Sequence, residues 1–346
     1  MVTAVDIASS PSPADRAADR PIALWLLACC AMIFAMVVIG GITRLTESGL
    51  SITEWKPISG VVPPLSDADW QHEFELYQQI PEYQQVHRGM TLAEFKGIFF
   101  WEYLHRLWGR LIGVVFAVPF LWFLLRGRIR RSLAPHLAAM LVLGGLQGAL
   151  GWFMVESGLS VRTDVSQYRL VAHLLAALAI YSYIFWTALT LLRPVPAADL
   201  AARRLRSHQF LLASAIAVTL AFGGFVAGLN GGLVYNTFPL MGGQLVPPDA
   251  FASTPAWRAP FEDPVAAQFI HRWLAMTVVA LVILLWLRAR RLRFLPIDLL
   301  GAMALLQAAL GISTLLLVVP VPLAVAHQAG AVVLWTLALW GLHATR

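Results

Sequence analysis

The sequence predicts an all-α integral membrane protein whose eight transmembrane helices form two tandem, parallel-repeat four-helix bundles. Three observations lead to this prediction. The chain of 346 residues is 59% hydrophobic and only 13% charged, with a mean hydropathy of +0.70, so much of its surface needs lipid as solvent. Eight weakly charged stretches are long enough to cross a bilayer. Short motifs in the first four stretches return in the same order in the last four.

Each predicted span is close to the ~20 residues that cross the hydrocarbon core as a helix. Backbone polar groups in lipid must be paired within the segment, and strands of a closed barrel would be about half as long, so helices are expected. The spans lie at about 22–43, 101–125, 134–155, 170–192, 209–229, 267–287, 297–319 and 323–343. Residues 1–20 are polar and are predicted to be a disordered cytoplasmic tail.

Arginines mark one side of the predicted membrane domain. Four of them fall in each of the segments 126–131, 193–208 and 288–293, and with eight spans these segments share a side with both termini. The positive-inside rule assigns that side to the cytoplasm. The loop 44–100 on the other side has eight acidic and four basic residues. Because the basic residues serve to orient the helices, we expect membrane lipid and no nucleic acid as a partner.

The first outer loop, 44–100, is too long and too aromatic to be a simple tether. Its segment DADWQHEFELYQQI can form an amphipathic helix at the outer surface, and we expect the loop to cap a site beneath it. The predicted organisation is therefore an N-terminal bundle at 21–193 with this cap, a cytoplasmic linker at 194–208 and a C-terminal bundle at 209–346.

Four motifs occur once in each half, in the same order. GG at 40–41 returns at 223–224, EYLHR at 102–106 returns as QFIHR at 268–272, LQGALG at 146–151 returns as LQAALG at 306–311, and VAH at 171–173 returns at 325–327. Four spans separate the two copies of each motif. An even number of spans preserves the direction of the chain, so the repeats are parallel.

Four of the nine histidines lie in the first turns of spans that enter from the outer side: His105, His173, His271 and His327. Ionisable residues in a membrane are uncommon and usually face a bundle interior. A single one could simply bond a neighbouring helix. Two at one depth in each half match the two axial ligands of a haem iron. Zinc fits less well, because no Cys, Asp or further His lies at those depths.

The remaining histidines receive plainer interpretations. His72 and His87 in the outer loop are expected on the surface, and His136, His208 and His343 at the cytoplasmic ends of spans. The adjacent Cys29 and Cys30 in the first span point apart on a helix, so no disulfide joins them.

One position distinguishes the two halves. Glu102 lies three residues before His105 and shares its helix face, whereas Gln268 stands in the same place before His271. A carboxylate can move protons and an amide cannot, which predicts chemistry in the first half and a redox cofactor in the second. A structural salt bridge with Arg106 is the alternative for Glu102.

An arginine follows one histidine in each half, and two interpretations of it stay open. Arg106 and Arg272 lie near the outer boundary, where a guanidinium can bind a haem propionate. Neighbouring residues on a helix point about 100° apart, so each arginine could instead extend to the membrane interface.

An ordered set of motifs resembles the haem A synthase family over essentially the whole chain after residue 20. The motifs are GGITRLTESGLSITEWKPISG at 40–60, EYLHRLWGR at 102–110, VAH at 171–173, NTFPLM at 236–241, FIHR at 269–272 and VAH at 325–327. Some members of the family have a cysteine pair in the outer loop of each half. This sequence has none there, so it is similar to the branch that lacks those disulfides.

The resemblance implies an oxidoreductase of the bacterial inner membrane that supplies haem A for cytochrome oxidase. Such an enzyme oxidises the C8 methyl of haem O to a formyl group by successive hydroxylations, with water as the oxygen source. The second half would hold haem b between His271 and His327, and the first would receive haem O between His105 and His173. Glu102 matches the family's catalytic glutamate. Haem O synthase is the implied partner, and the electron acceptor and oligomeric state stay open.

Two rival functions fit the same histidines. A dihaem cytochrome b would only pass electrons from quinol, and a haem carrier or chaperone would bind haem without converting it. The Glu102/Gln268 difference and the large outer cap favour the enzyme over both.

Overall fold

The structure, a computed structural model, describes residues 13–160, 162–192, 204–252, 255–292 and 295–345. Eight helices in these ranges are long and apolar enough to cross a membrane, as the sequence predicted. They are α1 (Pro13–Leu45), α4 (Leu92–Leu125), α5 (Ala134–Glu156), α6 (Gln167–Leu192), α8 (Arg206–Gly228), α10 (Pro264–Ala289), α11 (Leu295–Leu316) and α12 (Val321–Ala344). The shorter elements are η1 (Ser59–Val61), α2 (Asp67–Tyr77), α3 (Pro81–Gln85), η2 (Gly231–Leu233), η3 (Ala256–Arg258), α9 (Ala259–Glu262) and η4 (Arg290–Leu292).

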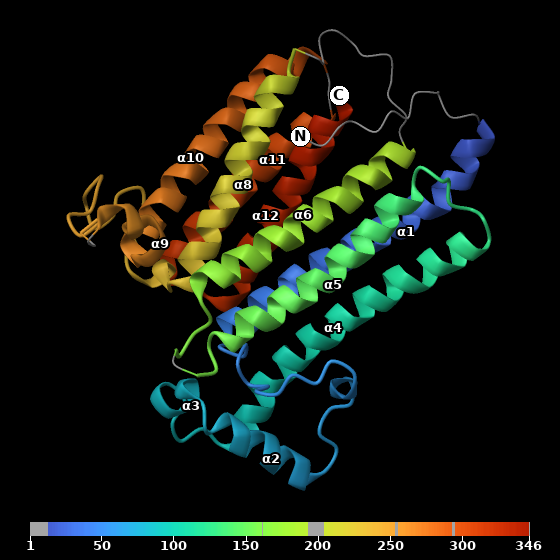
Figure 1. The fold of residues 1–346 in the computed structure, drawn as a ribbon. Coiled ribbons are helices and arrows are strands. Elements are labelled where there is room, and N and C mark those ends of the chain that lie inside the picture. Colours follow the sequence, from blue (N-terminus) through green and yellow to red (C-terminus); the bar gives the residue numbers. More distant parts are fainter. Residues whose placement is uncertain (1–12, 161, 193–203, 253–254, 293–294, 346) are drawn as a thin grey trace.

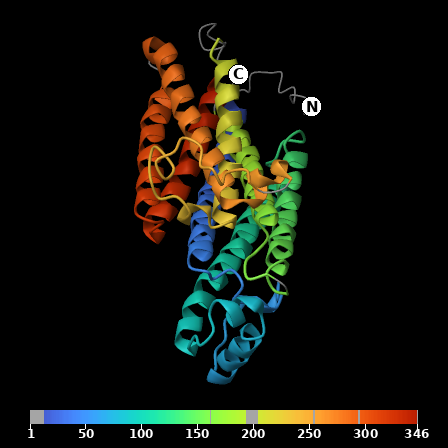
Figure 2. The ribbon, with the colours of Figure 1, turned by 90° about the vertical axis from the view of Figure 1, so that its left-hand side faces the viewer.

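The long helices pack as two groups, one from each half of the chain. Helices α1, α4, α5 and α6 contact one another, as do α8, α10, α11 and α12, and Figure 1 shows the two groups side by side. The start of α1 and the end of α12 lie toward one end of the molecule, and α2 and α3 form a cap beyond the first group at the opposite end (Figures 1 and 2). The halves are joined through α1 and α6 on one side and α8 and α12 on the other.

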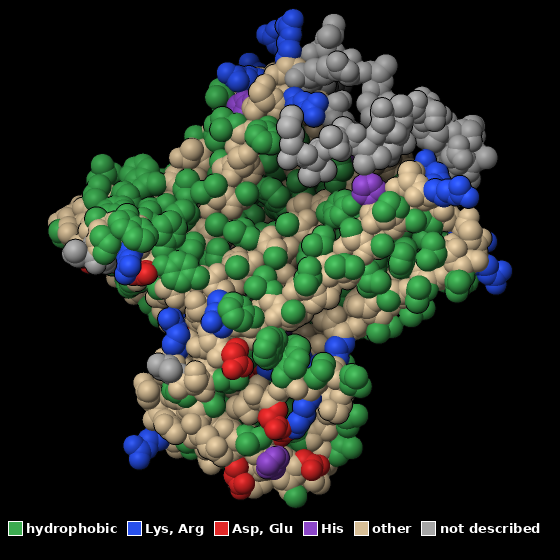
Figure 3. Space-filling view, in the orientation of Figure 1, with side chains coloured by type: hydrophobic (Ala, Val, Ile, Leu, Met, Phe, Trp, Pro, Cys, Tyr) green, Lys and Arg blue, Asp and Glu red, His purple; other side chains and the backbone are tan. Residues whose placement is uncertain are grey.

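Charge is distributed along the molecule as a membrane protein requires. In Figure 3 a broad hydrophobic band covers the middle, Lys and Arg gather toward the end opposite the cap, and Asp and Glu gather on the cap. This distribution supports the predicted orientation, in which the arginine-rich loops face the cytoplasm.

Local capping explains where some helices begin. Helix α4 starts at Leu92, well before the predicted span, because Thr91 and Glu94 form a capping box. The Glu94 N–H donates to Thr91 Oγ1 at 3.3 Å, and the Thr91 N–H donates to Glu94 Oε2 at 2.8 Å. Ser66 and Asp69 form the same motif at the start of α2, so the helix predicted from the loop sequence is confirmed.

The first helix corrects the predicted tail. Helix α1 begins at Pro13, so residues 13–20, expected to be disordered, are helical. Asp19 is buried there and pairs with Arg130 from the loop after α4, which offsets the cost of burying its carboxylate. The first part of the predicted tail, 1–12, and residues 194–203 of the predicted linker lie outside the described residues.

The hydrophobic cores lie in the inner halves of both groups. The first includes Trp25, Phe116, Phe120, Leu137, Met140 and Ile184. The second includes Leu212, Val282, Leu285, Ile297 and Leu300. The four span histidines lie outward of these cores, and each ring lies against a glycine.

The outer cap has a core of its own. Leu50, Phe74, Tyr77, Phe95 and Phe99 are all buried against one another. Because Phe95 and Phe99 belong to the outward extension of α4, the cap is packed directly on the helix that carries Glu102 and His105.

Candidate functional site

Two of the four histidines lie in each half of the structure. His105 lies on α4, His173 on α6, His271 on α10 and His327 on α12, and each side chain is partly buried. In the second half the ring centroids of His271 and His327 are 6.5 Å apart, with the ring planes at 89°. Two metal–nitrogen bonds of about 2.0 Å each, plus the ring radius on both sides, require about 6 Å. The second pair therefore fits one metal atom between two imidazoles.

The hydrogen bond of His271 selects the tautomer that a metal ligand needs. Its Nδ1 lies 3.1 Å from the Thr219 carbonyl oxygen on α8, which can only accept. Nδ1 therefore carries the proton and donates, and Nε2 keeps a free lone pair. Gly223 makes room for this ring, because a Cβ at that position would lie 3.1 Å from His271 Cε1.

His327 is held by the motif LQAALG on α11. The Gln307 amide nitrogen donates to the His327 carbonyl oxygen at 2.8 Å and lies 3.1 Å from its Nδ1. Gly311, one turn further along the same face, leaves space for the ring: a Cβ there would lie 2.7 Å from His327 Cε1. A side chain at this position would displace the imidazole.

The first half has the same arrangement around His173. Gln147 on α5 donates to the His173 carbonyl oxygen at 2.8 Å and its amide nitrogen lies 3.1 Å from Nδ1. A Cβ on Gly151 would lie 2.9 Å from His173 Cε1. His105 lies against Gly40 of α1, where a Cβ would lie 3.1 Å from its Nε2.

Glu102 is buried and fully hydrogen-bonded. Its Oε2 accepts from Ser51 Oγ at 2.7 Å and from the Ile52 N–H at 2.8 Å. Its Oε1 accepts from Arg106 Nε at 3.1 Å and Nη2 at 2.7 Å. The salt bridge with Arg106 weighed from the sequence is therefore present, and the same carboxylate fastens the start of the cap loop to α4 beside His105.

Arg106 also binds the cap loop through backbone carbonyls. It donates to Ile52 O at 2.8 Å and to Glu54 O at 3.2 Å. One turn further on, Arg110 donates to Lys56 O at 2.8 Å and Pro57 O at 2.9 Å. Arg106 therefore binds the cap loop, which was neither of the two interpretations drawn from the sequence. A contact between Arg106 and a haem propionate stays a prediction.

The second half fastens its outer loop at the matching positions without a carboxylate. Arg272 is buried and donates to the carbonyl oxygens of Thr237 at 2.9 Å and of Pro239 and Leu240 at 3.2 Å. Gln268 Nε2 donates to Tyr235 O at 3.0 Å. A contact between Arg272 and a propionate likewise stays a prediction. The first half therefore has the Glu102 carboxylate beside its histidines, whereas the second half has the neutral Gln268 amide at the matching position.

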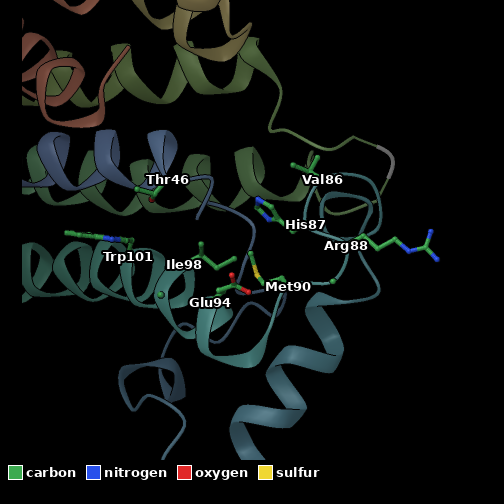
Figure 4. Close-up of a pocket in the computed structure, with 10 residues that line it drawn as sticks. Thr46, Val86, His87, Arg88, Met90, Glu94, Ile98 and Trp101 are labelled. Atoms are coloured by element: carbon green, nitrogen blue, oxygen red, sulfur yellow. The ribbon is translucent and has the colours of Figure 1, made fainter. Parts of the chain in front are cut away.

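A groove of about 600 Å³ lies along the outer part of α4. Glu94, Ile98 and Trp101 line it and lie at helical spacings that continue to His105, so the groove follows the helix face that carries the first histidine. Figure 4 shows His87 and Met90 of the cap loop on its other wall and Arg88 extending away from it.

The cap encloses a chain of titratable side chains. Tyr77 Oη lies 3.1 Å from Glu82 Oε2 and 2.7 Å from His87 Nδ1, and His87 Nε2 lies 3.0 Å from Glu47 Oε2. Burial raises the pKa of Glu82 to about 8, and the hydrogen bond from Tyr77 opposes this shift. His87 was expected on the surface, but its ring links the cap to the loop after α1.

Sequence reasoning paired the histidines within each half but missed what holds them. Gln147 and Gln307 lay within the repeated motif that was noticed, and their spacing of four residues from a glycine was the available signal. Ser51 carried no such signal, because only the fold brings the cap loop to Glu102. Cys29 and Cys30 are both buried and form no disulfide, as expected.

The described residues contain no group of three or more His, Cys, Asp or Glu side chains that could hold a metal ion. Fold and site together define a multi-pass α-helical membrane protein with one histidine pair in each half. The chain belongs to the cytochrome oxidase assembly protein family, which matches residues 23–339.

Similarity to named relatives extends over nearly the full length. The chain is 54% identical to the Heme A synthase of Rhodospirillum centenum, covering 100% of this chain and 94% of the relative. It is 49% identical to the Heme A synthase of Nitrosospira multiformis, covering 99% of both. It is 52% identical to the Heme A synthase of Paramagnetospirillum magneticum, covering 94% of both.

Proposed function

We infer that the chain is a haem A synthase, an oxidoreductase that converts the C8 methyl of haem O to the formyl group of haem A by successive hydroxylations. The observation that carries this conclusion is a histidine pair in each half of a chain that matches its relatives over nearly their whole length. Haem A made in this way serves cytochrome oxidase assembly.

The second half holds haem b between His271 and His327. The ring separation of 6.5 Å and the free Nε2 of His271 support this assignment. Bound haem b supplies one-electron redox chemistry. The chain's own contribution is to hold both imidazoles at fixed orientation and to place the neutral Gln268 where the first half has the Glu102 carboxylate.

The first half receives haem O between His105 and His173. Each hydroxylation by water releases two protons and two electrons, so the substrate needs a nearby base and an electron acceptor, whose identity is open. Glu102 is the base because it is the buried carboxylate one helical turn from His105. Ser51 and Arg106 orient it through their hydrogen bonds.

The two halves form tandem parallel repeats, with the N-terminal bundle at 21–193, the linker at 194–208 and the C-terminal bundle at 209–346. The matched contacts of Gln147 with His173 and of Gln307 with His327 support the repeat. The matched contacts of Arg106 and Arg272 with loop carbonyls extend it to the outer surface.

Extracted haems test the function directly. The full chain is expressed with and without a haem O source, and its haems are separated and weighed by mass spectrometry. We expect haem A to appear only with the source. Haem b alone under both conditions would favour an electron-transferring cytochrome b, and unconverted haem O would favour a carrier.

Substitution tests the cofactor assignment. His271→Ala and His327→Ala should each lose haem b, because one axial ligand does not replace two. His136→Ala is the matched control, since that histidine bonds Tyr183 at 2.5 Å near the opposite end of α5. Undiminished haem b in both variants would refute the assignment.

The protein lies in the bacterial inner membrane with both termini in the cytoplasm. Reporter fusions after residues 129 and 290 should give cytoplasmic signals, and fusions after 75 and 250 periplasmic signals. One reversed fusion would contradict the orientation. Haem O synthase is the expected partner, because haem O is too apolar to cross water freely, and co-purification tests that contact.

A further inference from the structure

The four histidines are held unequally. Three of them have a polar group at ring nitrogen Nδ1: Gln147 for His173, Thr219 for His271 and Gln307 for His327. The ring of His105 has no hydrogen bond within the described ranges. A ligand imidazole without such a partner is free to rotate and is a weaker donor to iron.

The ring of His105 also faces its neighbour with a different edge. Gly40 and Gly223 occupy matching positions in the GG motifs of α1 and α8. At Gly223 the nearest ring atoms to an added Cβ are Cε1 at 3.1 Å and Nδ1 at 3.6 Å of His271. At Gly40 they are Nε2 at 3.1 Å and Cδ2 at 3.5 Å of His105. The iron-binding nitrogen of His105 is therefore turned toward α1.

The glutamine contacts show what the held state involves. The Gln307 amide nitrogen donates to the backbone carbonyl of His327 and lies 3.1 Å from its Nδ1. Binding of iron through Nε2 requires the proton on Nδ1, so the amide must then turn its oxygen, which has no hydrogen-bond partner among the described residues, toward Nδ1 to accept from it and restrain the ring. Gly311 on the same face receives the ring edge. A rotated ring would lose the amide contact and meet the walls of this recess, whereas His105 can rotate without breaking a hydrogen bond.

We propose that His105 is the exchangeable axial ligand, which detaches so that haem can enter and leave the first half, while Gln147 and Gln307 are positioning residues that hold His173 and His327 in place. The proposal rests on the proposed function, because a substrate must leave after conversion and a resident cofactor must not. Under this proposal the same repeated scaffold holds one axial ligand that detaches in the first half and two that stay bound in the second.

Carbon monoxide tests this assignment, because it binds ferrous haem only where an axial ligand detaches. The purified full chain, loaded with haem, is reduced and titrated with carbon monoxide while absorbance difference spectra are recorded. We expect binding at the first-half haem only, and the signal should persist in His271→Ala, which lacks the second-half haem. Binding at the second-half haem of the unaltered protein would overturn the proposal.

The substitution Gln307→Leu removes the amide group that holds His327. We expect the second-half haem to gain carbon monoxide binding and to be retained about 10- to 100-fold less tightly, the usual effect of losing an outer-shell partner. Leu306→Ala, one residue away and exposed on the outside of α11, is the matched control and should change neither. Gln307→Leu behaving like Leu306→Ala would refute the positioning role.

Two further outcomes separate this proposal from the proposed function. Gln147→Leu should raise carbon monoxide affinity at the first half alone, which keeps the test open if Gln307→Leu does not fold. A protein that shows this binding pattern but makes no haem A would refute the synthase function and leave the ligand assignment standing. Normal haem A production with carbon monoxide bound at both halves would refute the ligand assignment and leave the synthase function standing.

Discussion

Replacing Glu102 by Gln tests whether its carboxylate is a base or only a fastener of the cap loop. The carboxylate accepts four hydrogen bonds, two from Arg106 and two from the loop at Ser51 and Ile52. The single carbonyl of a glutamine can keep the two bonds to the loop. Its NH2 group then faces the Arg106 guanidinium, so both bonds to arginine are lost.

The structural cost follows from these contacts. A hydrogen bond to a charged group contributes about 1.5–3 kcal/mol, so losing two costs about 3–6 kcal/mol. Arg106 keeps the carbonyls of Ile52 and Glu54, which favours the lower end of that range. Gln268 and Arg272 already coexist in the second half, so we expect Glu102→Gln to fold with its haem b, although its cap is less stable.

The catalytic cost is larger. Loss of a general base lowers a rate by about 100- to 10,000-fold, so haem O or a partly oxidised haem should accumulate in extracts of the Glu102→Gln protein. Arg106→Gln is the matched control, because it breaks the same ion pair and keeps the carboxylate. We expect Arg106→Gln to retain far more haem A production than Glu102→Gln. Equal losses in the two variants, or near-normal haem A from Glu102→Gln, would refute the base.

The remaining predictions concern the histidine recess and the cap. Gly311→Ala should displace His327 and lower haem b content, because its Cβ would lie 2.7 Å from the ring, whereas Gly148→Ala in open space should not; equal haem contents would contradict this. Neutral Glu82 is favoured in the folded cap, since its pKa is about 8 there against 4.5 when exposed. The unfolded chain therefore binds fewer protons between these values, and cap stability should fall as pH rises from about 4.5 to 8. Amide exchange of residues 67–87, corrected for intrinsic rates, should show this loss, and Glu82→Gln should abolish the pH dependence; an unchanged slope would contradict it.

Much of the fold was readable from the sequence because lipid imposes simple rules. Apolar stretches of about 20 residues must be helices, and arginine-rich loops indicate their orientation. The repeated motifs then paired His105 with His173 and His271 with His327, since parallel repeats bring matching positions to one depth. Those steps require only periodicity along the chain.

Other features depended on contacts between distant segments. Glu102 had an expected role, but only the packed cap brings Ser51 and Ile52 to its carboxylate. The sequence predicted His87 on the surface, whereas in the fold its two ring nitrogens lie within hydrogen-bond distance of Tyr77 and Glu47. Hydropathy carries no information on such loop contacts, because the loop residues are polar and their partners are set by packing.

The sequence alone determined which residues lie in the membrane, at what depth and in which half, because each of these follows from local composition and spacing. Only the tertiary structure decided how firmly each histidine is held. Gln147 and Gln307 stand in identical motifs, and His105 and His271 stand in nearly identical ones. Both rings lie against the matching glycines, but within the described residues only the ring of His271 also lies within hydrogen-bond distance of a backbone carbonyl, that of Thr219. A hydrogen bond forms only when donor and acceptor lie about 3 Å apart. Spacing along the sequence does not fix distances between helices this closely, whereas the packing of the helices does.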